Sequence, residues 1–257
     1  MSHSKQQIIG EEVAAKLNYT KFLDLLHASS DAAAFVDATF TRKSLTHKRL
    51  CQFIHEDFYL PEVTQGARVC VCLPNLPELG TCLISLLATQ RVGFPLNPAM
   101  TSVEMEWEIS NTRCIAVIAL ASQVSDHASA ATPASSVLTA AANLQLPVYA
   151  MQPSAETTGL FSISLVPSSL HVVSFSETDD TVTAAPSPHT HHPAPSSTVK
   201  GAQRHPELVM LLYTSGTSGR KKLVPYSLDM LVSGVSCIIA SVSTVSLNIF
   251  HHTSCTW

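Results

Sequence analysis

Hydrophobic and polar residues follow a regular order along the first half of the chain. Residues 68–73 alternate as a β-strand, residues 94–96 are apolar and strand-like, and residues 114–120 form a continuous apolar run. Between the first two strands lies an apolar stripe at helical spacing, formed by Leu79, Leu83, Leu86 and Leu87. Strands that alternate with helices of this length predict an α/β fold, in which helices cover both faces of a largely parallel sheet.

Residues that favour helix ends mark the predicted helix boundaries in this region. Asn75, followed three residues later by Glu78, is predicted to cap the first helix, and Gly93 is predicted to end it. Thr101 and Glu104 repeat the capping-box spacing. They precede a second predicted helix, whose apolar residues are Met105, Trp107 and Ile109.

The flanking regions continue the alternation of strands and helices. Residues 19–58 predict a helix, a short hairpin and a second helix, and the paired strands of the hairpin are expected at residues 34–37 and 39–41. A further helix is predicted at residues 135–143 and a strand at residues 147–151. The whole region therefore fits one α/β unit.

A composition change separates this unit from the rest of the chain. Residues 174–205 consist mainly of Ser, Thr, Pro, Ala and His, which predicts a solvated, flexible loop. His189, His191 and His192 could in principle hold a transition metal. Because the segment offers no cysteine and no rigid frame, we favour a solvent-exposed tract and assign no metal site.

The strongest chemical signal follows the apolar run at residues 208–213. That run ends in the sequence TSGTSG, which is followed at once by three cations. Gly216 and Gly219 can adopt backbone angles that turn successive N–H groups inward, so the segment can form an anion nest. The loop lacks the Walker spacing, which needs four residues between the glycines. A phosphate site is therefore favoured over a plain polar turn.

Hydroxyl groups and a lysine complete the predicted phosphate site. The hydroxyls add neutral donors, and a lysine just beyond the loop can neutralise phosphate charge. Arg220 and Lys221 are expected to face solvent without fixed contacts. The predicted phosphate-binding residues are Thr214, Ser215, Gly216, Thr217, Ser218, Gly219 and Lys222.

A helix is predicted directly after this loop and a short strand. Ser227 can cap it, and apolar residues recur at helical spacing. Residues 230–247 carry no charge and are long enough to span a membrane, but the six Ser and Thr residues between Ser233 and Ser246 favour a buried helix. The apolar stripe consists of Leu228, Leu231, Val232, Val235, Ile238 and Val242.

Composition excludes several classes of function. The chain has 257 residues, 46% of them hydrophobic, which is enough for a sizeable core. Its net charge of −4 gives no electrostatic basis for binding nucleic acid. The N-terminus lacks the apolar core of a signal peptide, so a cytoplasmic location is predicted. The seven cysteines form no CxxC pair, which favours buried reduced thiols over disulfides.

Two stretches carry a resemblance to a known family. Tyr213 to Gly219, followed after two residues by Lys222, resembles the signature of the adenylate-forming enzymes, which include acyl-CoA synthetases, aryl-CoA ligases, luciferases and the adenylation domains of peptide synthetases. Residues 73–109 are similar to the N-terminal subdomain of that family. The chain departs from the signature at Lys221, where proline is usual, at Leu223, where glycine is usual, and at Leu228, where histidine or glutamine is common.

The resemblance implies a function and a set of ligands. The loop would hold the β- and γ-phosphates of ATP with Mg²⁺, while a carboxylic acid attacks the α-phosphorus and coenzyme A then displaces AMP. This is acid–thiol ligase chemistry of the acyl-CoA synthetase type, as used in fatty acid metabolism. The family's adenine motif, ribose-binding acidic residue and catalytic lysine would lie downstream of Trp257, so we assign no catalytic residue.

We therefore interpret the chain as an N-terminal portion of such an enzyme that is inactive alone. The alternative is an inactive remnant or truncated isoform that binds at most a nucleotide or another protein. The expected segments are a tail at residues 1–18, an N-terminal α/β subdomain at 19–173, the flexible loop at 174–205, the phosphate-loop strand and helix of an incomplete ATP-binding subdomain at 206–248, and a divergent end at 249–257.

Overall fold

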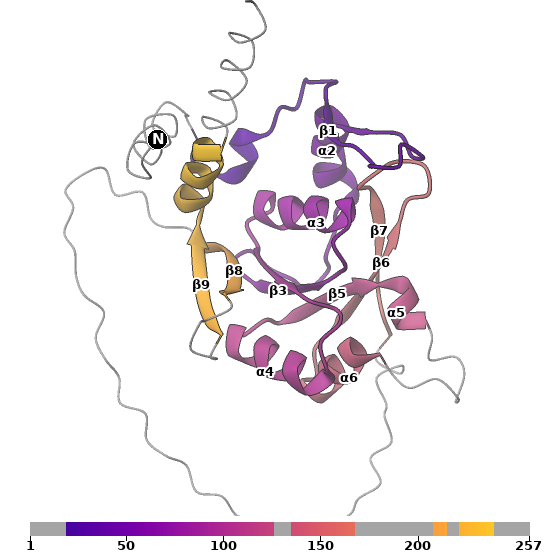
Figure 1. Ribbon diagram of the computed structural model, residues 1–257, viewed down its shortest axis with the longest axis vertical. Helices are drawn as coiled ribbons and strands as arrows, with labels where there is room; N and C mark the ends of the chain where they lie inside the picture. The colour runs from indigo at the N-terminus through magenta and orange to yellow at the C-terminus, as the bar shows by residue number, and fades with distance from the viewer. Residues whose placement is uncertain (1–18, 126–134, 168–207, 215–220, 239–257) are drawn as a thin grey trace, which may run out of the picture.

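The computed structural model describes residues 19–125, 135–167, 208–214 and 221–238, which form a sheet of seven strands with helices on both faces (Figure 1). Residues 228–238 are helical. The named elements in chain order are the 3₁₀ turn η1 (Phe22–Leu25), β1 (Ala33–Phe35), β2 (Leu45–Thr46), α2 (His47–Gln52), the π-turn η2 (Phe53–Asp57), β3 (Arg68–Cys72), α3 (Pro77–Ala88), β4 (Val92–Leu96), α4 (Ser102–Thr112), β5 (Ala116–Leu120), α5 (Ala121–Ser125), α6 (Ser136–Asn143), β6 (Val148–Pro153), β7 (Phe161–Leu165), β8 (Leu208–Thr214) and β9 (Lys222–Ser227).

The seven-stranded sheet is largely parallel, which confirms the predicted fold class. Its strand order is β7-β6-β5-β3-β4-β8-β9. The five inner strands pair in parallel, while β7 and β9 pair antiparallel at the two edges. Although β8 follows β4 by more than a hundred residues, the two strands are neighbours, so residues far apart in sequence meet at one end of the sheet.

Each face of the sheet is covered by its own helices and has its own core. Figure 1 shows α3 on one face and α4 and α6 on the other. Along β3, Val69 and Val71 belong to the core under α3, and Cys70 and Cys72 belong to the core under α4 and α6. Because successive side chains of a strand point to opposite faces, a strand buried on both sides reads as a continuous apolar run. This explains the sequence of β3.

The helix boundaries confirm one predicted cap and correct two others. Thr101 and Glu104 form the capping box of α4 as predicted. Asn75 is not the cap of α3, because that helix begins after Leu76 with a proline in its first turn. Gly93 does not end α3 either, since it lies inside β4. A Cβ there would come within 2.8 Å of the Leu83 Cδ2 atom, so the glycine allows α3 to pack closely on the sheet.

The N-terminal hairpin was predicted with the wrong partner strand. β1 pairs with β2 rather than with residues 39–41. The hydroxyls of Thr39 and Thr41 donate instead to the Asp37 carboxylate, at 2.8 and 2.9 Å, which closes a turn. The predicted first helix is only the single 3₁₀ turn η1. Hydrogen bonds among these short polar side chains therefore form a turn at residues 39–41, where the sequence pattern predicted a strand.

The helix after β9 begins as predicted, since the Ser227 Oγ accepts a hydrogen bond from the Met230 N–H at 3.3 Å. Leu228 and Val232 are buried, but Val235 and Ile238 of the predicted stripe are exposed. Within the described ranges, no helix is long and apolar enough to cross a membrane. Outside those ranges lie residues 1–18, 174–205 and 249–257, together with Val242, His189, His191 and His192.

Five of the described cysteines are buried free thiols, as predicted. Cys51, Cys70, Cys72, Cys82 and Cys114 are all buried. Burial raises the pKa of Cys72 to about 12 and that of Cys114 to about 11. These groups are therefore protonated at neutral pH and act as small apolar side chains.

Candidate functional site

The predicted phosphate loop connects β8 to β9 at an end of the sheet. Five of its seven predicted residues, Ser215, Gly216, Thr217, Ser218 and Gly219, lie outside the described residues. The structure describes the two strands that flank them. Because β8 runs parallel to β4, the last residue of β8 lies at the end of the sheet where the carboxyl ends of the parallel strands meet. Open α/β sheets bind their ligands at this end.

The other two predicted residues face each other across the hairpin. Thr214 is the ladder partner of Lys222, and the Thr214 hydroxyl lies 3.4 Å from the Lys222 carbonyl oxygen. Both residues are exposed. Among the described residues, the Lys222 ammonium has no hydrogen-bond or ion-pair partner. Directly paired residues of a ladder project to the same face, so the Thr214 hydroxyl and the Lys222 side chain lie side by side.

The strand before the loop is held in place through Tyr213. The Tyr213 hydroxyl accepts a hydrogen bond from the Asn111 Nδ2 amide at 2.6 Å. The tyrosine ring packs edge-on against Phe94 of β4, with ring centroids 5.8 Å apart, and lies 5.9 Å from the ring of Trp107. Residues of both β4 and α4 therefore fix the side chain one position ahead of Thr214.

The strand after the loop is held through Lys221, which corrects a prediction. The Lys221 ammonium lies 2.6 Å from the Glu108 carboxylate of α4, whose side chain is only 5% exposed, whereas that of Lys221 is 49% exposed. Lys221 was expected to have no fixed contact. The hydrogen bond to Glu108 raises the pKa of Lys221, so the lysine remains charged at neutral pH. The partners are 113 positions apart in the sequence, so no local pattern could indicate this pair.

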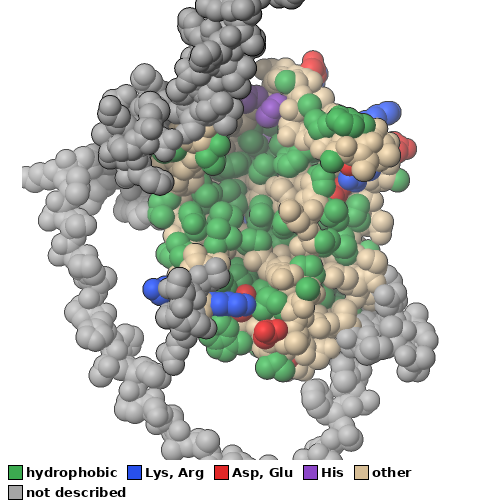
Figure 2. All heavy atoms as spheres, viewed as in Figure 1, with side chains coloured by type: hydrophobic (Ala, Val, Ile, Leu, Met, Phe, Trp, Pro, Cys, Tyr) green, Lys and Arg blue, Asp and Glu red, His purple; other side chains and the backbone are tan. Residues whose placement is uncertain are grey.

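The two lysines at the hairpin therefore differ in their electrostatic surroundings. Glu108 offsets the charge of Lys221, with Glu104 as a further acidic neighbour. Figure 2 shows basic side chains at this end of the hairpin with acidic side chains beside them. Lys222 has no such partner within the described part of the chain, so its charge is available to an anion. This arrangement favours the predicted choice of Lys222 over Lys221 as the phosphate ligand.

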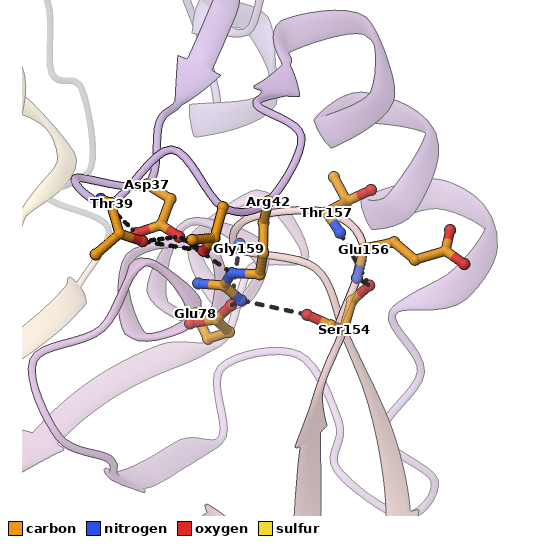
Figure 3. Close-up of polar contacts among 9 residues, drawn as sticks. Asp37, Thr39, Arg42, Glu78, Ser154, Glu156, Thr157 and Gly159 are labelled. Carbon is orange, nitrogen blue, oxygen red and sulfur yellow. Dashed lines mark hydrogen bonds and ion pairs between the residues drawn. The ribbon is translucent and has the colours of Figure 1, made fainter.

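A second polar cluster, drawn in Figure 3, involves Glu78 of α3, the helix that covers the face of the sheet opposite α4 (Figure 1). The Arg42 Nη1 lies 2.6 Å from the Glu78 carboxylate, which also accepts a hydrogen bond from the Gly159 N–H at 3.1 Å. The Arg42 Nη1 also donates a hydrogen bond to the Ser154 carbonyl oxygen, at 3.3 Å. The Arg42 Nε lies 3.7 Å from the Asp37 carboxylate. The cluster joins the segment after β1 to α3 and to the turn between β6 and β7. We assign it a structural role.

A metal centre is not found in the described part of the chain, where no three His, Cys, Asp or Glu side chains are grouped so that they could hold an ion. The predicted capacity of this site stays that of an anion-binding loop between two strands. Its donors would be backbone amides, hydroxyls and one lysine, which together suit a phosphate chain.

A sequence-family model described as "AMP-binding enzyme" matches residues 31–257. No curated protein matches the chain in sequence.

Solved structures similar to the chain include proteins from Rhodopseudomonas palustris and Mycobacterium tuberculosis. ATP-bound MatB from Rhodopseudomonas palustris is 18% identical, with a TM-score of 0.49, over 82% of this chain and 35% of that chain. The inhibitor-bound N-terminal domain of FACL13 from Mycobacterium tuberculosis is 15% identical, with a TM-score of 0.44, over 80% of this chain and 43% of that chain. The chain thus spans less than half the length of either structure.

Proposed function

Since the chain belongs to the family of AMP-binding enzymes, we propose that it supplies the ATP phosphate-binding part of an acid–thiol ligase of the acyl-CoA synthetase type. The observation that carries the proposal is the pairing of Thr214 with Lys222 on either side of a Thr, Ser and Gly loop at the end of β8. In this arrangement, the lysine with no acidic partner among the described residues lies next to the loop.

In the proposed reaction, this loop binds and orients the phosphate chain of the nucleotide. Its amides and hydroxyls donate to the β- and γ-phosphate oxygens, and Lys222 offsets their charge. A carboxylate then attacks the α-phosphorus, pyrophosphate leaves, and the thiol of coenzyme A displaces AMP from the acyl-adenylate. The loop stabilises the charge that develops on the leaving pyrophosphate. Mg²⁺ would arrive with the nucleotide and neutralise part of its phosphate charge.

Complete ligase chemistry needs more contacts than this loop provides. By the resemblance, the groups that bind adenine, ribose and the acid come from segments that follow the loop in longer relatives. We therefore propose that these 257 residues alone bind the nucleotide at most, and that adenylation belongs to a longer enzyme. The cytoplasmic location indicated by the N-terminal sequence stays a prediction.

The proposal is tested by nucleotide binding to the purified chain. Isothermal titration with Mg·ATP and with pyrophosphate should give saturable binding. Lys222→Ala should weaken that binding at least about tenfold, because a hydrogen bond to a charged group contributes about 1.5 to 3 kcal/mol. Lys48→Ala, which removes an exposed lysine from α2, is the matched control and should bind like the wild type.

Two results would contradict the proposal. If neither Mg·ATP nor pyrophosphate binds to the wild-type chain, the phosphate assignment is wrong. ATP–pyrophosphate exchange that depends on an added carboxylic acid would show that the 257 residues are catalytically sufficient, against the division of roles proposed above.

A further inference from the structure

One helix contacts the strands on both sides of the predicted phosphate loop. Asn111 of α4 donates to the Tyr213 hydroxyl at 2.6 Å, one residue before Thr214. Glu108 of α4 accepts from Lys221 at 2.6 Å, one residue before Lys222. Glu108 and Asn111 are three residues apart, so they lie on the same face of the helix. A single rigid element therefore holds the chain at both ends of the loop.

We propose that Glu108 and Asn111 are positioning residues that set the geometry of the phosphate loop through Tyr213 and Lys221. The inference rests on the proposed function, because it names what holds that site in shape. A loop whose two ends are fixed loses less conformational freedom when an anion binds. Neither residue needs to touch the phosphates, since each acts through the neighbour of a predicted ligand.

Glu108 is well placed for this role because its carboxylate is buried. With a side chain 5% exposed, it cannot be fully hydrated, and Lys221 is the only described side chain that donates to it. A buried carboxylate without its cation carries an uncompensated charge, which is energetically costly. This cost strongly favours the state in which Glu108 is paired with Lys221. The pairing thus keeps Lys221 on α4, while Lys222 projects from the adjacent position of β9.

The Arg42–Glu78 pair supplies a matched control within the same protein. It also joins a cation to a nearly buried helix carboxylate at 2.6 Å, and the Glu78 side chain is 1% exposed. Figure 3 places it beside the Ser154 to Gly159 turn, and α3, which carries Glu78, covers the opposite face of the sheet from α4. A substitution there disturbs a similar interaction without touching the hairpin.

The test compares pyrophosphate and Mg·ATP binding to the purified chain and its variants. Glu108→Gln and Asn111→Ala should each weaken binding about fivefold, the factor that corresponds to the typical net contribution of one hydrogen bond. Glu78→Gln should bind like the wild type, as should Ser110→Ala, which removes an exposed hydroxyl from the same helix.

Lys221 gives a second measurement that separates positioning from folding. Lys221→Arg can retain the pair with Glu108 and should bind like the wild type. Lys221→Met leaves the Glu108 carboxylate buried without its cation, so it should weaken binding at least as much as Glu108→Gln. The double variant with both Lys221→Met and Glu108→Gln should bind no more weakly than Lys221→Met alone, because both changes disrupt the same contact and the double variant leaves no unpaired carboxylate buried.

The outcomes distinguish this inference from the function on which it rests. If the wild type does not bind either probe, the proposed function fails and the positioning role fails with it. If the wild type binds and Lys222→Ala does not, but Glu108→Gln and Asn111→Ala bind normally, only the positioning role is overturned. It is also overturned if Glu78→Gln weakens binding as much as Glu108→Gln, since the effect would then reflect general stability.

Discussion

The Arg42–Glu78 pair should contribute unequally to stability depending on which partner is removed. Arg42→Met leaves the Glu78 carboxylate buried, with the Gly159 N–H as its remaining donor. Breaking a buried pair in this way costs about 3 to 5 kcal/mol. We take the lower end, about 3 kcal/mol, because the Arg42 side chain is 19% exposed and water screens part of the interaction.

Removing the carboxylate charge instead should be much less harmful. Glu78→Gln keeps an oxygen that can accept from Arg42 and Gly159, and the arginine can reach solvent, so we expect a loss of about 1 kcal/mol. A chain with both Arg42→Met and Glu78→Leu should be more stable than Arg42→Met alone, since no unpaired charge remains buried.

Urea unfolding followed by circular dichroism measures these differences as free energies of unfolding. The order of the variants by free energy of unfolding tests whether an unpaired buried carboxylate is the cause of the loss. If Glu78→Gln were as destabilising as Arg42→Met, an uncompensated buried carboxylate would not be the cause, and the structural role assigned to this cluster would have to be revised.

Three further predictions concern the backbone, acid stability and thiols. Gly159→Ala should cost about 2 kcal/mol and Gly66→Ala about 1 kcal/mol of unfolding free energy: both have φ near +78°, but only the first new Cβ would meet a hydroxyl, at 2.7 Å. The hydrogen bond from the Thr101 N–H lowers the pKa of Glu104 below its ordinary value of 4.5. The ionised Glu104 therefore stabilises the folded state above pH 4.5, and this contribution is lost as pH falls through the lowered pKa. Glu104→Gln should make the free energy of unfolding depend less on pH in that acid range. Iodoacetamide should label Cys82, whose pKa burial raises strongly, far more slowly than the half-buried Cys237, as mass spectrometry can measure.

Features encoded by neighbouring residues could be predicted from the sequence. The capping box of α4 depends on two residues three apart, and the burial of β3 follows from its own apolar run. The pattern failed for Trp107, which was grouped with Met105 and Ile109 but is 55% exposed. Residues four apart share a helix face, whereas a residue two positions along points away. The spacing itself could have shown that Trp107 lies on the outer side.

Features that depend on distant residues were missed. No residue near Lys221 in the sequence indicates that it pairs with Glu108. Likewise, no residue near Thr46 indicates that β2, and not the segment 39–41, is the partner strand of β1. Such contacts follow from the order of strands in the sheet, which brings β8 beside β4. Strand order is set by the packing of the whole domain and has no signature in a short window of sequence.

The predicted phosphate ligands and the residues that hold the hairpin in place therefore come from different parts of the sequence. Six of the predicted ligands are consecutive and Lys222 follows after two residues, because a nest needs consecutive amides and a nearby cation. Their support comes from α4, which buries Met105 and Ile109 in the core and presents Glu108 and Asn111 to the hairpin. A substitution that shifts α4 in the core would thus displace both ends of the loop together. Phosphate affinity in this protein should consequently depend on packing more than a hundred residues before the loop.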